Sequence, residues 1–268
     1  MLTTLDGRMV SEKIAAELSL EIKRLKIEPG LAIIQVGDLA TSSLYIKRKI
    51  AFANKIGVRV DHLRFSEDSY QDELLSEIDK LNHNNDVGGI IVQLPLPNKL
   101  DKSKIVEEIA PEKDVDGLRV GSIFTPATAR GILSLLDHYQ IKISGKRVVV
   151  VGRSTLVGKP IARALLSRGA TVTICHRQTQ NLADETRRAD ILVVAAGSPH
   201  LIKENYVKPG QVVIDVGLSS TGEGKLLGDV DQVSVREIVS AISPVPGGVG
   251  PMTVVSLFLN LLDAYKSK

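Results

Sequence analysis

The chain has 268 residues, of which 43% are hydrophobic and 24% are charged, and its formal net charge is +3. These proportions are ordinary for a globular enzyme of one or two domains. The net charge is small and the sequence has no prominent run of lysine and arginine, so we expect no nucleic-acid partner. No apolar run approaches the length of a membrane span, so we expect no membrane association.

Cys175 is the only cysteine, so a disulfide within the chain cannot form. This favours a reducing compartment, and the N-terminus lacks a charged segment followed by an apolar one, so we expect a cytoplasmic protein. Cys175 lies inside an expected buried strand, and we interpret it as a core thiol and not as a catalytic one. We expect no metal site.

The first half of the chain alternates helices with strands. Residues 1–26 carry apolar residues at helical spacing, with Ser11 as the expected N-cap. Strands are expected at 31–36, 58–65 and 88–94, and helices at 41–55, with Thr41 or Ser42 as N-cap, at 69–82 and at 102–110. This alternation predicts an αβ unit with a parallel sheet.

The second half begins after an irregular segment, residues 111–128, which we interpret as a crossing between domains. A connecting helix is expected at 128–139, and strands at 147–151, 170–175, 191–195 and 212–216. Residues 243–251 form a dense proline and glycine turn cluster. The final helix, residues 252–265, is expected to pack back on the first domain.

The strand at 147–151 leads into a turn of the size that holds a phosphate, followed by a helix from Leu156. Gly152 permits the sharp turn, and Gly158 permits close approach of the helix to the strand. Ser154 replaces the middle glycine of the G-x-G-x-x-G fingerprint. From this turn alone, a dinucleotide site and an ordinary buried strand–turn–helix are about equally supported.

The next strand favours a dinucleotide with a phosphorylated ribose. It ends in His176-Arg177, where an NAD-binding chain usually carries an acid that binds the ribose hydroxyls. A basic pair there, together with Arg153 in the turn, suits a 2′-phosphate. We therefore favour NADP over NAD.

Tyr45 and Lys49 are four residues apart, so they share one face of a helix that follows a strand's carboxyl end. Ligands of open parallel sheets bind at that edge. Because Lys47, Arg48 and Lys49 are consecutive, the local sequence alone favours a solvated lysine. Gln93 ends the third strand, so its amide is expected to reach the same crevice.

Asp114 and Asp116 flank Val115. In an extended segment they lie on opposite sides, so only one of them is expected to enter the crevice. A carboxylate can recognise the N–H groups of a heterocycle, but aspartates in surface loops are common.

Six motifs, in order along the chain, resemble the bifunctional methylenetetrahydrofolate dehydrogenase/cyclohydrolase family. They are Val36-Gly37 with Ser42, Tyr45 and Lys49; Gly89 to Pro97; Pro111 to Gly117; Val151 to Ser154 with Val157, Gly158 and Pro160; His176 to Thr179; and Pro244 to Thr253. The resemblance implies oxidation of 5,10-methylenetetrahydrofolate to the methenyl form with NADP, and then hydrolysis to 10-formyltetrahydrofolate. It also implies a homodimer formed through the Rossmann domains.

The resemblance implies an α/β fold of two domains with a cleft between them. The N-terminal parallel-sheet domain, residues 1–125 plus 244–268, is expected to be catalytic and to bind folate. Residues 126–243 are expected to form the C-terminal Rossmann-type NADP-binding domain.

The resemblance also implies the site residues. Lys49 matches the catalytic lysine, Gln93 the glutamine that tunes it, Asp116 the aspartate that holds the pterin, and Tyr45 the tyrosine beside the folate rings. The folate walls are Val92, Leu94, Pro246 and Gly247. The dinucleotide contacts are Gly152, Arg153, Ser154, Arg177, Thr179 and Leu218.

Two departures from the family pattern bear on the balance of the two activities. The loop from Leu118 to Thr125 is short, and Ala129 replaces a proline. One alternative is a dehydrogenase that lacks the hydrolase activity. A second is a catalytically silent Rossmann-type module, which the combination of Lys49, Gln93 and Asp116 disfavours.

Overall fold

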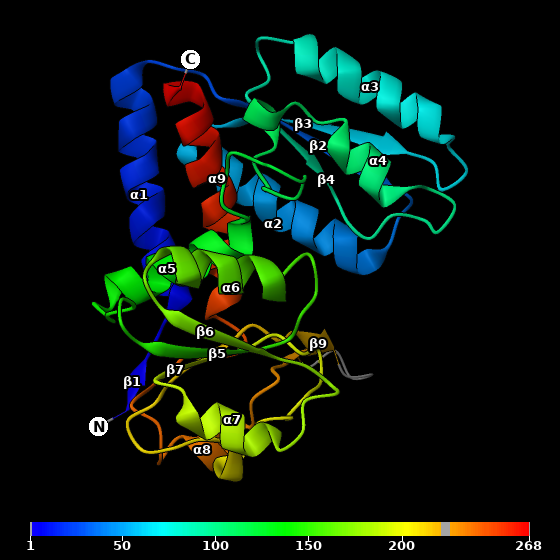
Figure 1. Cartoon of the computed structure of the whole chain (residues 1–268). Helices are drawn as coiled ribbons and strands as arrows, with labels where there is room; N and C mark the ends of the chain where they lie inside the picture. The colour runs from blue at the N-terminus through cyan, green and yellow to red at the C-terminus, as the bar shows by residue number, and fades with distance from the viewer. Residues whose placement is uncertain (1, 221–225, 268) are drawn as a thin grey trace. The chain divides into compact units, whose positions relative to one another are not determined.

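The computed structural model describes residues 2–220 and 226–267 (Figure 1). The chain divides into two compact units. Unit 1 comprises Met1–Glu12 and Thr128–Thr253, and unit 2 comprises Lys13–Ala127 and Val254–Lys268. The boundary falls within three helices, α1 (Gly7–Leu25), α5 (Ala127–His138) and α9 (Val249–Lys266).

Unit 2 contains a three-stranded parallel sheet in the order β3-β2-β4. The strands are β2 (Gly30–Val36), β3 (Arg59–Phe65) and β4 (Gly89–Val92). The central strand, β2, is buried along its whole length, which fits its apolar sequence. Because Val36 pairs with Phe65 and Ile34 with Val92, the carboxyl ends of all three strands lie at one edge.

Helices cover this sheet on two sides (Figure 1). They are α2 (Ala40–Ile56), α3 (Gln71–His83) and α4 (Lys102–Glu107), with a 3-10 turn at Pro111–Lys113. Ile34 and Ile90 of the sheet form one apolar cluster with Ile78 of α3 and Ile105 of α4. Helix α2 lies on the opposite side of the sheet from α3.

The part of α9 in unit 2 packs against the first half of the chain. The Tyr265 hydroxyl accepts the Gly30 N–H at 2.9 Å, and Phe258 stacks on Phe52 with ring centroids 5.0 Å apart. The Asn260 amide donates to the carbonyls of Val115 and Thr125 at 2.7 and 3.0 Å. The C-terminal helix therefore holds segments that are distant in sequence.

Unit 1 contains a six-stranded parallel sheet in the order β1-β11-β8-β7-β5-β6. Its strands are β1 (Thr3–Thr4), β5 (Arg147–Val151), β6 (Thr171–Cys175), β7 (Ile191–Val194), β8 (Val212–Asp215) and β11 (Ala241–Ile242). Strands β6 and β7 flank β5 on its two sides, so the strand order reverses at β5. Such a reversal creates a ligand crevice at the carboxyl ends of the strands.

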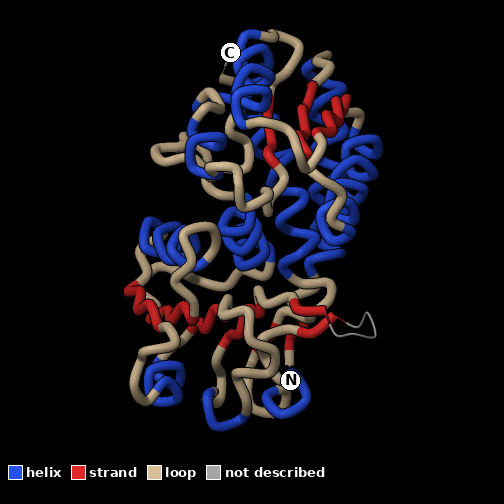
Figure 2. Tube along the Cα trace, turned by 90° about the vertical axis from the view of Figure 1, so that its right-hand side faces the viewer, coloured by secondary structure: helices blue, strands red, loops and turns tan. Residues whose placement is uncertain are grey.

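The remaining elements of unit 1 are α6 (Gly158–Ser167), α7 (Leu182–Arg188), α8 (Gln232–Val235), a 3-10 turn at Glu204–Tyr206, and the antiparallel pair β9 (Ser219–Ser220) and β10 (Leu226–Leu227). Figures 1 and 2 show helices on both faces of the six-stranded sheet. The expected α/β class, with parallel sheets, is confirmed.

The two units and the division expected from the sequence differ mainly at two places, because the boundary expected at residue 126 moves only to Thr128. Strand β1 pairs with β11, which puts the N-terminal residues in unit 1. The turn after β11 also lies in unit 1, because it packs on the start of α1: a Cβ added to Gly7 would be 1.8 Å from the Gly248 carbonyl oxygen. The functional division into a folate domain and an NADP domain stays a prediction.

Two expected helix caps are wrong. Helix α1 begins at Gly7, because the Asp6 carboxylate accepts the N–H groups of Arg8 and Met9 at 2.9 and 3.1 Å, and Ser11 lies inside the helix. Helix α2 begins at Ala40 without a side-chain cap, so Ser42 lies in its first turn.

Candidate active site

Lys49 lies on α2 and is buried, with 7% of its surface exposed, whereas Lys47 and Arg48 are exposed. The solvated lysine favoured by the local sequence alone is therefore wrong for Lys49. Helical spacing turns one residue of this basic run inward and leaves the other two in water. A buried ammonium needs a polar partner.

That partner is Gln93, which directly follows β4. Lys49 Nζ donates a hydrogen bond to Gln93 Oε1 at 3.0 Å. Gln93 Nε2 donates to the Leu94 carbonyl at 2.8 Å, which directs its oxygen toward the lysine. The Gln93 N–H donates to the Ile34 carbonyl at 2.8 Å, so the residue is fixed at the carboxyl edge of the sheet.

Burial dominates the electrostatics of Lys49 and Asp116. Burial lowers the pKa of Lys49 by disfavouring the ammonium, and the charge of Asp116 opposes that shift. Burial raises the pKa of Asp116, and Lys49 opposes that shift in turn. The neutral amine of Lys49 is therefore accessible at lower pH than in a solvated lysine.

Asp114 and Asp116 have different surroundings, but not for the reason of spacing in an extended segment, because a 3-10 turn at Pro111–Lys113 runs directly into the turn that contains them. Asp114 is 1% exposed, and its carboxylate accepts the N–H groups of Leu118 and Arg119 at 3.3 and 3.1 Å. Burial raises its pKa, and its hydrogen bonds oppose that shift. Asp114 thus holds a turn of the loop, whereas Asp116 interacts with Lys49.

Tyr45 lies one helical turn before Lys49 and is partly buried. Burial raises the pKa of Tyr45, and the Arg48 guanidinium, 5.8 Å from the ring centroid, opposes that shift. Ser42 is three residues before Tyr45 and is also buried. Its hydroxyl has no hydrogen-bond partner within the part of the chain that the structure describes.

Ser42 belongs to the first family motif, but the sequence pattern assigns it only a possible helix cap and no role in the site. Its spacing of seven residues from Lys49, two turns of one helix face, was the available signal. Val92 and Leu94 flank Gln93; Val92 is buried and Leu94 is partly buried.

The short loop after Asp116 is held by contacts within unit 2. The Val120 N–H donates to the Glu107 carboxylate at 2.7 Å, and Arg119 pairs with Glu107 at 3.6 Å. A Cβ added to Gly117 would be 2.8 Å from the Pro126 backbone. The short loop is therefore anchored to α4 through Glu107.

The turn after β5 has the close packing that the sequence predicts. Gly152 has a φ of 130°, and an added Cβ would be 2.1 Å from the Ala195 carbonyl oxygen. A Cβ added to Gly158 would be 2.1 Å from the Gly152 carbonyl oxygen. The Ser154 hydroxyl accepts the N–H groups of Val157 and Gly158, both at 3.2 Å, and so stabilises the start of α6.

Basic side chains accompany this turn at the same edge of the sheet, because Val151 of β5 pairs with Cys175 of β6. Arg153 donates to the Gln178 amide oxygen at 3.1 Å, and both Arg153 and Arg177 are exposed. The Thr179 hydroxyl accepts the His176 N–H at 2.9 Å, which shapes the turn.

Three further expected residues follow other strands of unit 1. Leu218 comes after β8 and is 40% exposed. Pro246 and Gly247 lie between β11 and α9; Pro246 is exposed, and the Gly247 carbonyl accepts the Arg8 N–H at 3.0 Å.

Cys175 is 1% exposed and belongs to the apolar core of unit 1. Burial raises the pKa of its thiol, with the charge of Glu185 adding to that shift. These surroundings are those of a core residue, because a reactive cysteine needs a stabilised thiolate.

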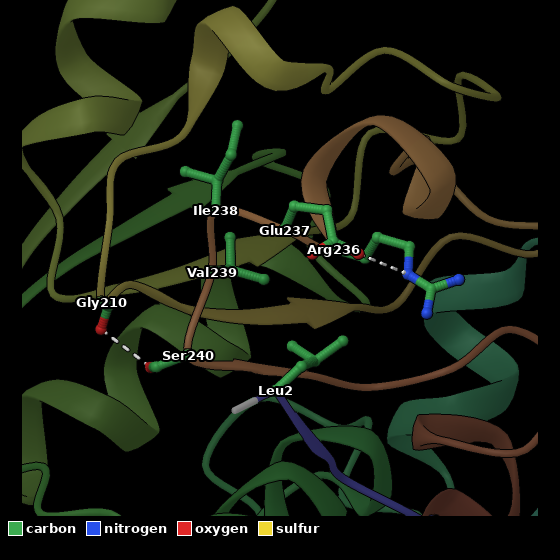
Figure 3. A pocket seen from close by; sticks show the side chains of 7 residues that line it. All are labelled: Leu2, Gly210, Arg236, Glu237, Ile238, Val239 and Ser240. Atoms are coloured by element: carbon green, nitrogen blue, oxygen red, sulfur yellow. Dashed lines mark hydrogen bonds and ion pairs between the residues drawn. The ribbon is translucent and has the colours of Figure 1, made fainter.

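A surface pocket in unit 1 lies at the other edge of the sheet (Figure 3). Its lining includes Leu2, Gly210 and Ser240, which precede β1, β8 and β11. Ser240 Oγ donates to the Gly210 carbonyl at 2.8 Å. Because parallel sheets bind ligands at the carboxyl ends of their strands, this pocket is separate from the dinucleotide turn.

Residues 2–220 and 226–267 contain no group of three or more His, Cys, Asp or Glu side chains placed to hold a metal ion. No helix in those ranges combines the length and apolar character that a bilayer crossing needs.

Together these features define a class of protein. A parallel sheet with a glycine turn at its point of reversal is the dinucleotide-binding arrangement. A buried lysine held by an amide at the carboxyl edge of a second sheet is a candidate for proton transfer. The chain is thus an α/β enzyme with two units, of the class that uses a dinucleotide cofactor.

Matches to family models identify the protein family to which the chain belongs. Residues 5–116 match the catalytic domain of tetrahydrofolate dehydrogenase/cyclohydrolase, and residues 126–268 match its NAD(P)-binding domain. The chain belongs to the tetrahydrofolate dehydrogenase/cyclohydrolase family, so the resemblance predicted from six motifs is confirmed.

Relatives match over nearly the whole chain. The bifunctional protein FolD of Ligilactobacillus salivarius is 48% identical over 273 residues, covering 97% of this chain and 96% of the relative. The bifunctional FolD structure from Campylobacter jejuni has a TM-score of 0.96 at 41% identity, covering 100% and 99% of the two chains. The Trypanosoma brucei enzyme, solved with NADP and an inhibitor, has a TM-score of 0.92 at 36% identity, covering 99% and 98%.

Proposed function

We propose that this enzyme oxidises 5,10-methylenetetrahydrofolate to the methenyl form with NADP and hydrolyses that product to 10-formyltetrahydrofolate. The observation that carries the proposal is the hydrogen bond between the buried Lys49 and the partly buried Gln93 at the carboxyl edge of the unit 2 sheet. Membership of the family supports both reactions.

The residues after β5 and β6 fit NADP. A Cβ on Gly152 or Gly158 would clash with neighbouring backbone, so glycine keeps the turn after β5 tight, and the N-terminus of α6 that follows it can face a pyrophosphate. We assign Gly152, Arg153, Ser154, Arg177, Thr179 and Leu218 to the cofactor. The exposed Arg153 and Arg177 suit a 2′-phosphate, because no acid follows β6 before Thr179. When bound, NADP supplies the acceptor for the hydride.

We assign the folate to the face of α2 that carries Lys49. Asp116 can accept hydrogen bonds from the pterin N–H groups, and the ring of Tyr45 can pack beside the pterin. Val92, Leu94, Pro246 and Gly247 are assigned to the walls of the folate site. Among the residues that the structure describes, the Ser42 hydroxyl has no hydrogen-bond partner, so it is available to a bound molecule.

In the hydrolysis, water attacks the positively charged carbon between N5 and N10 of the methenyl form. The neutral amine of Lys49 takes the proton that the water loses, and Gln93 orients the amine. The C–N5 bond of the adduct then breaks: the adduct hydroxyl loses its proton and becomes the formyl carbonyl, N5 receives a proton, and the formyl group stays on N10. One proton is released overall.

The testing experiment is an assay with methylenetetrahydrofolate and NADP, quenched with and without acid. Acid converts the formyl product back to the methenyl form, so the two quenches count the products separately. NADPH formation with loss of the methenyl form supports both activities. Methenyl accumulation that decays at the uncatalysed rate would select the dehydrogenase without hydrolase activity.

We also propose that the enzyme is a homodimer that pairs through unit 1. Strand β6 is an edge strand, with Ile174 40% exposed, and Leu166 on the neighbouring α6 is 61% exposed. Such an edge can pair with a second copy. Leu166→Lys is expected to shift the mass in light scattering toward a monomer, whereas Leu20→Lys, at an exposed leucine in unit 2, is not. A dimer that survives both changes would contradict this interface.

A cytoplasmic location is proposed from the single buried cysteine, which fits a reducing compartment. Cell fractionation with a cytoplasmic marker checks it, and recovery in the periplasmic fraction would contradict it.

A further inference from the structure

Unit 1 buries two aspartates that no assigned site uses. Asp215, at the end of β8, is 1% exposed, and Asp229, after β10, is 0% exposed. A buried carboxylate is costly unless hydrogen bonds compensate it. The backbone N–H groups that donate hydrogen bonds to the two carboxylates show which segments the aspartates hold in place.

Asp229 binds the loop that follows β7. Its Oδ2 accepts the N–H groups of Ala196 and Gly197 at 2.7 and 2.8 Å, and its Oδ1 accepts the Ser198 N–H at 2.8 Å. Three consecutive backbone N–H groups therefore converge on one carboxylate. Hydrogen bonds of this charge-assisted kind are stronger than neutral ones, so the loop has a fixed conformation.

The same loop packs against the dinucleotide turn. A Cβ added to Gly152 would be 2.1 Å from the Ala195 carbonyl oxygen. The loop after β7 is therefore in close contact with the turn after β5 and restricts the position of its backbone. Strands β5 and β7 are neighbours, and the strand order reverses at β5. The loop is thus a wall of the crevice in which a dinucleotide binds.

Asp215 in turn holds the backbone of Asp229. Its Oδ1 accepts the N–H groups of Gly217 and Asp229, and its Oδ2 accepts that of Val230, all at 3.0 Å. Glycines leave no room for either carboxyl group to move. A Cβ on Gly217 would be 2.2 Å from Asp229 Cγ, and one on Gly228 would be 2.0 Å from Asp215 Oδ2.

We propose that Asp229 is a positioning residue for the NADP site, acting through the loop 195–198 on the turn at Gly152, with Asp215 supporting it. This inference rests on the proposed function. The three N–H groups of the loop are occupied by Asp229, so the loop shapes the crevice and does not itself bind phosphate.

The experiment compares Asp229→Asn with Asp231→Asn. The asparagine side chain keeps the shape of the aspartate but presents an NH₂ group to at least one N–H of the loop. Asp231 lies two residues further on, and its carboxylate accepts the Ser234 N–H at the start of α8, so it is a matched control outside the crevice. Calorimetric titration with NADP gives the dissociation constant and the stoichiometry separately, and cyclohydrolase turnover reports the folded fraction.

Asp229→Asn is expected to raise the NADP dissociation constant and KM on the order of tenfold, with stoichiometry per folded subunit retained. Asp231→Asn is expected to match the wild type. An unchanged dissociation constant, or a lower stoichiometry alone, would overturn the proposal, because Asp229 would then only stabilise the fold.

If Asp229→Asn does not fold, Asp215→Asn is measured in its place. We expect this variant to raise the NADP dissociation constant as well, but by a smaller factor. No shift in this variant would also overturn the proposal. A wild-type enzyme that neither binds nor reduces NADP would instead refute the proposed function.

Discussion

At the scale of single residues, Lys49 differs from its two basic neighbours only in where it points. Lys47 and Arg48 are in water, whereas Lys49 is buried beside Gln93 and interacts with Asp116. Burial lowers the pKa of Lys49, so this lysine loses its proton more readily than a solvated lysine does, as a general base must.

Lys49→Met is expected to abolish cyclohydrolase activity, because methionine has about the same length but cannot take a proton. The expected loss is on the order of a hundredfold to ten-thousandfold, the range of general acid–base catalysis. Hydrolysis of methenyltetrahydrofolate measures it, with Lys47→Met as the control. Hydrolysis at the wild-type rate in Lys49→Met would refute the assigned role.

Gln93→Glu is expected to shift the pH–rate profile of hydrolysis upward in pH. A carboxylate beside Lys49 favours the ammonium, which raises the pKa of the lysine, and the reaction uses the neutral amine. At neutral pH the rate is therefore expected to fall. The measurement is kcat/KM against pH, and an unmoved acidic limb would argue against Lys49 as the base.

At the scale of elements, the turns after β5 and β6 share one edge of the unit 1 sheet because the two strands are parallel and paired. Each turn contributes an exposed arginine, Arg153 and Arg177. Arg153 is already held by Gln178 at 3.1 Å, so it needs little ordering when an anion binds.

Changing both Arg153 and Arg177 to Ala is expected to raise the KM for NADP on the order of tenfold to a hundredfold, with little change in the KM for NAD. Only NADP carries the 2′-phosphate that these side chains would bind. Steady-state kinetics with both cofactors test this, with Arg163→Ala, an exposed arginine of α6, as the control. Equal effects on both cofactors would rule out the 2′-phosphate assignment.

At the scale of the whole molecule, each unit buries the inner strands of a parallel sheet, and unit 1 also buries the carboxyl of Asp215. Burial raises the pKa of this carboxyl from 3.8 to about 7; Asp229 adds to the shift, and the three N–H donors oppose it. The folded state therefore binds this proton more tightly than the unfolded state does. The stability gained is fully present below about pH 4 and is lost as pH rises through about 7.

Asp215→Asn is expected to flatten the fall in unfolding free energy between about pH 4 and pH 8, because asparagine does not titrate. The difference between the two proteins over that range is expected to be at most about 4 kcal/mol. Denaturant unfolding at a series of pH values measures it. Parallel pH dependences in the two proteins would show that Asp215 keeps an ordinary pKa.

Local sequence patterns predicted most of the helices and strands, because buried parallel strands read as β-branched apolar runs and helices as periodic ones. They missed β1, β9, β10, β11, α7 and α8, which are two to seven residues long. The four missed strands have two residues each, which is too few for a period, and β1 and β11 exist because each has a partner distant in sequence.

The family, the α/β class and the glycine turn at Gly152 could all be predicted from local patterns, since motif order and strand–turn–helix patterns are properties of the chain before it folds. The family motifs already pointed to Lys49 and Asp116. The tertiary structure adds that Lys49 is the buried residue of the 47–49 run and that the charge of Asp116 acts on it. It alone brought Asp229 to the loop at 196–198, about thirty residues earlier in the chain. Burial and pKa depend on which distant segments the fold packs together, and no local pattern encodes that.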